Sequence, residues 1–184
     1  MLTDTVLPPA NVPGLRWLAN LHPDPREVLD TWHARKLAPI PLGNFHVVRT
    51  TSTLGILALQ QLEQEAPTGR PVLWTRPHAV MDFLVAPTPL TWQSDGAGQL
   101  LKDGSLECPP PGRASDMRWP SRWAAQPDGS GYLPDMREIV EALLRLYHQE
   151  ADRPEPESVE VRPPAAGAAA AFFVTARRVA ADVH

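Results

Sequence analysis

The distribution of proline constrains this chain more than any other feature of its sequence. The 184 residues include 22 prolines, and proline ends helices and interrupts central strands because it lacks a backbone N–H. Five prolines lie in residues 1–25, four in residues 152–164, and thirteen in between. The regular elements must therefore be short, and we expect a compact body between two proline-rich ends.

The two outer groups of prolines predict three parts of the chain. Residues 1–23 contain one short apolar patch, Leu15–Leu18, which we expect to contact the body. Residues 152–164 carry too few apolar groups to offset the entropy of ordering, and the Ala-rich stretch beyond them is compatible with a terminal helix, a strand or flexible chain. We predict an extended segment over 1–23, one domain over 24–151 and a tail over 152–184.

Composition and charge exclude several classes of protein. The chain is 43% hydrophobic with a net charge of −4, and no run approaches the roughly 18 apolar residues of a membrane helix. It begins with an acid and two prolines, where a signal peptide has a basic stretch and an apolar core. The lone Cys108 fits a reducing compartment. We expect a cytoplasmic protein without a membrane partner, and the acidic balance disfavours unspecific nucleic-acid binding.

Three segments have the periodicity and capping residues of helices. Asp24 is a capping acid before a helix that we predict to about Arg35, with prolines 39 and 41 ending it. Thr51 or Ser52 caps a second helix to about residue 64, which is apolar nearly all round, as expected of a well-covered helix. The third helix is predicted over 134–150.

Short strands account for most of the remaining body. The predicted strands are residues 44–50, 71–74, 79–86, 99–101, 105–108 and 117–124, with 90–93 as a further strand or a short helical turn. The spacing of 71–74 and 79–86 predicts a hairpin, and Asp103-Gly104 is a hairpin turn signal. Pro120 favours an edge position for the last strand. These elements predict an α+β (mixed α/β) domain, with a small sheet flanked by two or three helices.

No short signature of catalysis is present in the chain. The phosphate loop, the nucleophile elbow, paired cysteines and the zinc-protease motif are all missing from the sequence. The six histidines are scattered, with no spacing that would place two on one face of an element. We therefore expect neither a cofactor nor a metal, and we list no catalytic residue.

Asp82 is the most informative single acid. Strand alternation places Asp82 on the same face as Leu84, where a carboxylate needs a partner. Arg49 and Arg76 are the candidates for that partner. A structural ion pair or an exposed sheet face is the simpler interpretation, since no second acid lies within two residues to complete a metal site.

Basic and aromatic residues interleave at one place in the chain. This run contains Arg118, Trp119, Arg122 and Trp123, and Arg113 lies upstream of it. Core packing of the tryptophans is one interpretation, and a platform for a ligand is the other. A nucleic-acid site would require the arginines and at least one tryptophan to share one exposed face.

Three longer runs of sequence indicate a family. TGRPVLWTRPHAVMDFLVAP (68–87), SLECPPPGR (105–113) and RWAAQPDGSGYLPDMREIVEALL (122–144) resemble small actinobacterial proteins similar to the N-terminal domain of bifunctional DNA primase/polymerases. The resemblance covers about residues 24–150. It implies the α/β fold of archaeo-eukaryotic primases, which is related to the sheet of the RNA-recognition motif.

The chain departs from that family at its catalytic motifs. Active members carry an Asp-x-Asp or Asp-x-Glu pair, which holds two metal ions, on the strand that here reads FHVVRTT (45–51). They also follow a glycine-rich strand with Pro-Pro-Ser and a histidine, where this chain has PPPGR (109–113). The resemblance thus implies that polymerase activity is lost, while Arg49 and Arg113 remain able to pair with phosphate.

We therefore expect a non-catalytic, primase/polymerase-like binding module that acts through a protein partner, a homo-oligomer contact or a nucleotide-bearing ligand. Its expected site is a shallow cleft on the sheet face bearing Arg49, Asp82 and Arg113. A DNA- or RNA-binding accessory factor that uses the arginine–tryptophan run is the alternative. A further alternative is an active nucleotidyltransferase with relocated acids such as Asp82, Asp95 and Asp103.

Overall fold

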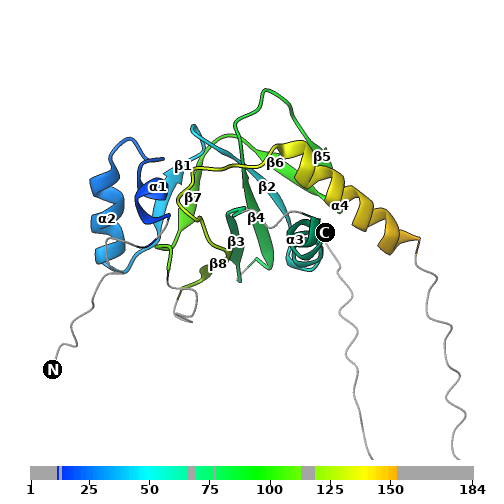
Figure 1. The fold of residues 1–184 in the computed structure, drawn as a ribbon, viewed down its shortest axis with the longest axis horizontal. Helices are drawn as coiled ribbons and strands as arrows, with labels where there is room; N and C mark the ends of the chain where they lie inside the picture. The colour runs from blue at the N-terminus through cyan, green and yellow to red at the C-terminus, as the bar shows by residue number, and fades with distance from the viewer. Residues whose placement is uncertain (1–11, 13, 66–68, 77, 113–118, 153–184) are drawn as a thin grey trace, which may run out of the picture. The chain divides into compact units, whose positions relative to one another are not determined.

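The computed structural model describes residues 12, 14–65, 69–76, 78–112 and 119–152 (Figure 1). These residues belong to one compact unit. Arg113 and Arg118 lie outside the described residues, as does all of the predicted tail beyond residue 152.

Four helices lie within the described residues. They are α1 (Leu15–Ala19), α2 (Pro25–His33), α3 (Ser52–Glu65) and α4 (Met136–Ala151). The three helices predicted from periodicity are confirmed as α2, α3 and α4. Helix α1 lies in the segment expected to be extended, and Leu18 is completely buried, so the body of the protein includes the apolar patch before residue 24. No helix in the described ranges is long and apolar enough to cross a membrane.

The strands form two antiparallel sheets. They are β1 (Ala38–Pro41), β2 (His46–Thr51), β3 (Val72–Thr75), β4 (Val80–Val85), β5 (Gln93–Ser94), β6 (Gly98–Leu101), β7 (Ser105–Cys108) and β8 (Ser121–Ala125). The larger sheet has the order β5-β6-β2-β4-β3-β8, and the smaller one pairs β1 with β7. The predicted α+β class is confirmed, as are the β3–β4 hairpin and the edge position of β8.

One strand was not predicted, and one expectation about strands is wrong. The unpredicted strand is β1, which contains Pro39 and Pro41, because a strand with one neighbour tolerates proline on its open side. The turn at Asp103-Gly104 does not close a hairpin, since β6 pairs with β2 and β5 while β7 pairs with β1. This turn instead carries the chain from one sheet to the other, so that Leu106 and Cys108 of β7 reach the apolar core around α2.

The larger sheet is covered on both faces (Figure 1). On one face, Val48 and Phe83 pack with apolar residues of α3 and α4. On the other face, Val47 and Leu84 pack with α1, α2 and the small β1–β7 sheet. Alternate residues of β2 and β4 therefore pack into two separate cores, as the two-residue period of a strand requires.

Helix α3 lies tightly against the sheet on its inner side and is open on its outer side. A Cβ atom on Gly55 would come within 2.7 Å of Met81 Cβ on β4. On the outer side, Ile56 and Leu57 are 45% and 42% exposed. The expectation that neighbours cover this apolar helix nearly all round is therefore wrong for its outer face.

The close approach of α3 to β4 predicts the effect of a single methyl group. Alanine is the better helix former by about 1 kcal/mol, but Gly55→Ala must displace the buried Met81, and such overpacking costs about 1–3 kcal/mol. We expect a net loss in the free energy of unfolding, measured by urea denaturation. Gly43→Ala is the control, since no atom lies within 4 Å of its added Cβ. Equal stability of both variants would contradict this packing.

Candidate functional site

The register of β2 and β4 brings together two of the predicted site residues. Arg49 and Asp82 are direct cross-strand partners. Arg49 Nε donates to Asp82 Oδ1 at 2.7 Å, and Nη2 donates to Oδ2 at 3.0 Å. The Asp82 side chain is completely buried, whereas that of Arg49 is 37% exposed. The hydrogen bond to Asp82 raises the pKa of Arg49, so the guanidinium keeps its charge at any physiological pH.

This ion pair has a clear chemical consequence for the sheet face on which it lies. Both oxygens of the Asp82 carboxylate accept hydrogen bonds from Arg49 and are neutralised by its charge. Across the described parts of the chain, no group of three or more His, Cys, Asp or Glu side chains is arranged to hold a metal ion. Asp95 and Asp103 thus do not complete a metal-binding cluster with Asp82. Arg49 lies on β2, the strand where the family resemblance implies catalytic acids, and Asp82 lies on the neighbouring strand β4.

The arginine–tryptophan run does not present one common surface. Trp123 is 5% exposed, and its indole Nε1 donates to the carbonyl oxygen of Pro109 at 3.0 Å. Arg122 is exposed and lies on the opposite face of the sheet, as consecutive strand residues must. Trp119 is half-buried. The shared exposed face that a nucleic-acid site requires therefore does not include Trp123.

Arg122 instead stacks on a tryptophan that the sequence did not single out. Its guanidinium carbon lies over the ring of Trp74, 4.2 Å from the centroid. The guanidinium carbon of Arg76 lies 5.4 Å from the same centroid. The two-residue spacing of Trp74 and Arg76, at the end of β3, could have indicated a shared face, but Arg122 joins them only through the pairing of β3 with β8.

A largely apolar groove lies between α3 and α4. It encloses about 360 Å³. Its lining residues are Thr51, Thr53, Leu54, Leu57, Gly96, Leu146, Tyr147 and Glu150. Gly96 has a φ of 88°, and an added Cβ there would lie within 2.7 Å of the Tyr147 ring, so glycine lets the β5–β6 turn close one side of the groove. The sequence does not reveal this groove, because the apolar residues of α3 predict a helix that is covered nearly all round.

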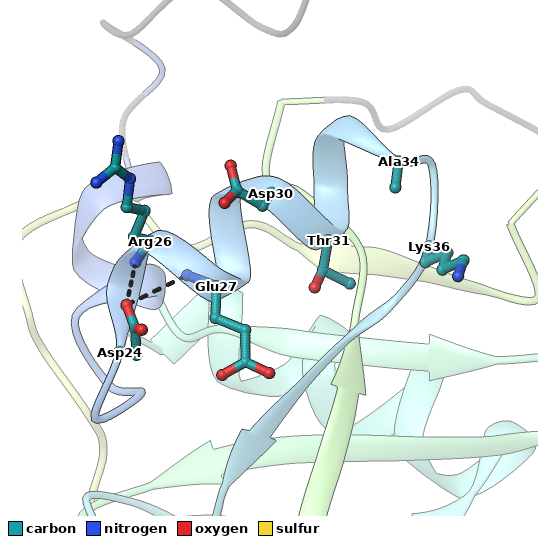
Figure 2. Close-up of a pocket in the computed structure, with 7 residues that line it drawn as sticks. All are labelled: Asp24, Arg26, Glu27, Asp30, Thr31, Ala34 and Lys36. Carbon is teal, nitrogen blue, oxygen red and sulfur yellow. Dashed lines mark hydrogen bonds between the residues drawn. The ribbon is translucent and has the colours of Figure 1, made fainter.

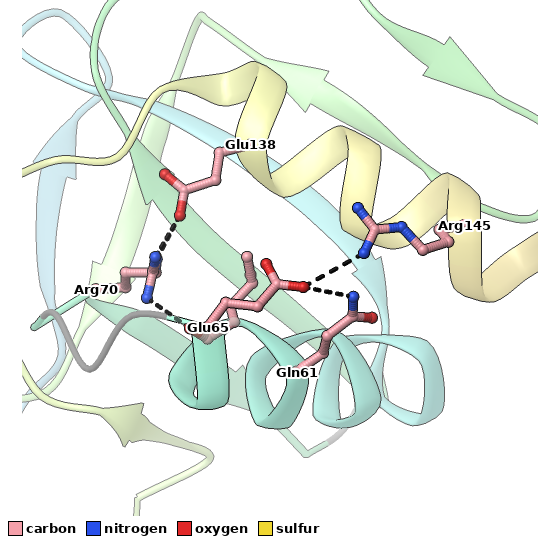
Figure 3. A network of polar contacts seen from close by, with 6 residues as sticks. Gln61, Glu65, Arg70, Glu138 and Arg145 are labelled. Atoms are coloured by element: carbon pink, nitrogen blue, oxygen red, sulfur yellow. Dashed lines mark hydrogen bonds and ion pairs between the residues drawn. The ribbon is translucent and has the colours of Figure 1, made fainter.

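Polar contacts fix the two helices that form the groove (Figure 3). Arg70, which is 3% exposed, pairs with Glu138 of α4 and donates from Nη1 to the carbonyl oxygen of Leu62 in α3 at 3.1 Å. Glu65 of α3 accepts hydrogen bonds from Gln61 at 2.8 Å and from Arg145 of α4 at 3.3 Å. The bond from Gln61 lowers the pKa of Glu65. These contacts connect α3 to α4 and preform the groove.

A second hollow lies along the outer side of α2 (Figure 2). It is broad and lined mainly by polar and charged side chains of the helix and of Lys36. Asp24 is engaged in capping, since its Oδ1 accepts from the backbone N–H groups of Arg26 at 3.0 Å and Glu27 at 3.3 Å. This is the arrangement of a solvated helix face, and it brings no converging groups toward a ligand.

Cys108 is held as an inert part of the core. It is completely buried, and its backbone oxygen accepts a hydrogen bond from Trp32 Nε1 at 2.9 Å. Burial raises the pKa of the Cys108 thiol well above its ordinary value, and the nearby carboxylates of Asp82 and Glu107 act in the same direction. A neutral, enclosed thiol is a poor nucleophile.

No family model, curated protein or solved structure matches this chain. The resemblance to primase/polymerase domains therefore stays a prediction from the residues quoted above.

The Arg49–Asp82 pair predicts a strongly non-additive response to substitution. Arg49→Met leaves a buried carboxylate without its partner, and we expect the free energy of unfolding to fall by about 2–4 kcal/mol, since Arg49 is partly solvated. Adding Asp82→Leu to Arg49→Met should recover most of that loss. Urea unfolding of both single variants and the double variant measures the coupling. If the double variant loses as much free energy of unfolding as the two single variants together, the predicted coupling is refuted.

The burial of Cys108 predicts protection from thiol reagents. Because it is the chain's one cysteine, labelling reports on this site alone. At about pH 8 we expect the Cys108 thiol of the folded protein to react only as fast as the protein unfolds. The urea-unfolded chain, in which the thiol is accessible, is the reactive control. As pH rises past the ordinary thiol pKa, the unfolded chain ionises first, so the native protein should lose stability relative to Cys108→Ala. Labelling of the folded protein at the rate of the unfolded chain would contradict both statements.

Proposed function

We propose that this protein is a non-catalytic, primase/polymerase-like binding module that acts through a protein partner at the α3–α4 groove. The observation that carries this proposal is the apolar outer face of α3 beside a preformed groove. Ile56 and Leu57 are 45% and 42% exposed, and Leu57 lines the groove itself. Burying such side chains against a partner favours association through the hydrophobic effect.

The charge around the groove defines the chemistry of the partner. Helix α3 contains no lysine or arginine, and its exposed C-terminal turn carries Glu63. Glu150 lines the groove, and Asp95 precedes its Gly96 wall. A second copy of the chain would bring these acidic rims together, which opposes association. The groove therefore suits an amphipathic segment of another protein, with an apolar anchor flanked by Lys or Arg.

The Arg49–Asp82 pair supports the non-catalytic part of the proposal. Arg49 stands on the strand where the resemblance implies metal-binding acids, and both of its hydrogen bonds go to the Asp82 carboxylate of the next strand. The alternative of a DNA- or RNA-binding accessory factor has less support, because Trp123 is in the core. We place the module in the cytoplasm, on the ground of its single buried cysteine.

An exposed leucine outside the groove makes this proposal testable. The probe is a synthetic amphipathic helix of about four turns, with leucines on one face and lysines on the other, followed by fluorescence anisotropy. We expect Leu57→Asp to weaken binding by about tenfold or more, since an interface anchor is lost. Leu90→Asp is the matched control, because Leu90 is 40% exposed, does not line the groove and gives the same change in charge.

Three results would overturn the proposal. Equal loss in both variants would mean that the groove has no special part in binding the peptide. Equal binding of a peptide with glutamates in place of lysines would remove the argument from charge. A dimer of the unmodified chain that Leu57→Asp dissociates, detected by analytical ultracentrifugation, would identify a second copy as the occupant.

A further inference from the structure

A second surface with its own chemistry lies at the β3–β8 edge of the larger sheet. Trp74 and Arg122 are direct cross-strand partners in the antiparallel register. The backbone N–H of Arg76 donates to the carbonyl oxygen of Pro120 at 2.9 Å, which continues the pairing beyond the end of β3. Two strands from distant parts of the sequence therefore bring Arg76 and Arg122 to the same indole ring.

The stacked geometry concentrates positive charge at one place. The guanidinium carbons lie 4.2 Å (Arg122) and 5.4 Å (Arg76) from the centroid of the Trp74 ring. Each cation is attracted to the negative π cloud of the ring. The positive charge of the exposed Arg122 favours an anion beside it.

Stacking leaves the donors of Arg122 available. A guanidinium that lies over a ring uses its π face, while its N–H groups point outward in its own plane. Arg122 is exposed, and within the described residues its side chain makes no hydrogen bond or ion pair besides its contact with Trp74. Arg49 is the contrast, since Asp82 takes two of its donors. The side-chain donors of Arg122 are therefore available to an anionic ligand.

The ring itself is not the recognition surface. Trp74 is half-buried, and its indole Nε1 is enclosed without an acceptor among the described residues. Arg122 lies over the ring face on which a base would otherwise stack. The ligand is therefore recognised by its charge and not by an aromatic group.

We propose that Arg122, with Arg76 beside it on Trp74, binds a phosphate group. A planar guanidinium matches the oxygens of a phosphate in a two-donor arrangement. The same chemistry is offered by a free nucleotide and by the backbone of a single-stranded nucleic acid. This site lies on the opposite face of the sheet from Arg49 and Asp82, outside the residues of the groove, and it does not depend on the function proposed for the groove.

Calorimetric titration of the full chain with inorganic phosphate, ATP and a single-stranded oligothymidine tests this proposal. We expect at least one of the three to bind at low salt, and Arg122→Gln to weaken that binding by about tenfold. Arg16→Gln is the matched control, because Arg16 is an exposed arginine on α1 and gives the same change in charge. Arg122→Lys keeps the charge without the planar fork, so its affinity should fall between those of the parent and Arg122→Gln.

The three probes distinguish the sources of phosphate. Binding of ATP or inorganic phosphate that is lost in Arg122→Gln supports a small phosphorylated ligand. Binding of the oligothymidine alone, with a salt-dependence slope that falls by about 0.7 in Arg122→Gln, supports a nucleic-acid backbone. Absence of binding by all three probes overturns the proposal. Equal weakening by Arg16→Gln also overturns it, because general attraction to positive charge would then explain the data. Melting temperatures of the variants confirm that each is folded.

Discussion

The pairing of β2 with β4 is the contact on which the rest of this structure depends. These two strands lie in the middle of the larger sheet, and their alternate residues supply both cores. The same register aligns Arg49 with Asp82, which has no exposure to solvent. A slip by one residue would turn every apolar side chain to the wrong face and leave the carboxylate without its guanidinium. The ion pair therefore selects one register among those that hydrophobic burial alone would allow.

The parts of the fold that the sequence predicts well are those with local causes. Asp24 caps α2 as expected, because a capping acid acts on N–H groups two and three residues away. The pairing of β7 with β1 has no local cause. A turn at Asp103-Gly104 is compatible with a hairpin, and only the distant strand β1 and the core around α2 determine that β7 leaves the larger sheet. Strand β1 could not be predicted for the same reason. A strand tolerates residues such as Pro39 and Pro41 only where one of its sides has no neighbouring strand, and the local sequence does not show this.

The candidate site also has parts that the sequence predicts and parts that depend on the tertiary structure. Burial of Asp82 could be predicted from strand alternation, and so could its need for a cation. The choice of Arg49 over Arg76 required the register, and Arg76 instead borders Trp74. The α3–α4 groove escaped prediction because an apolar helix surface looks the same in sequence whether the protein's own core or a partner covers it. Only the arrangement of neighbouring elements shows that Leu57 faces outward.

The edges of the larger sheet bear on how this protein behaves at high concentration. At one edge, β5 is only two residues long. At the other edge, β8 follows Pro120 and contains one extra residue, Ala124, where its register with β3 shifts, and the bulge twists this strand away from a flat ladder. A short edge on one side and a bulged edge beside a proline on the other resist growth by strand addition. The sheet is thus protected from edge-to-edge aggregation, and association is left to side chains.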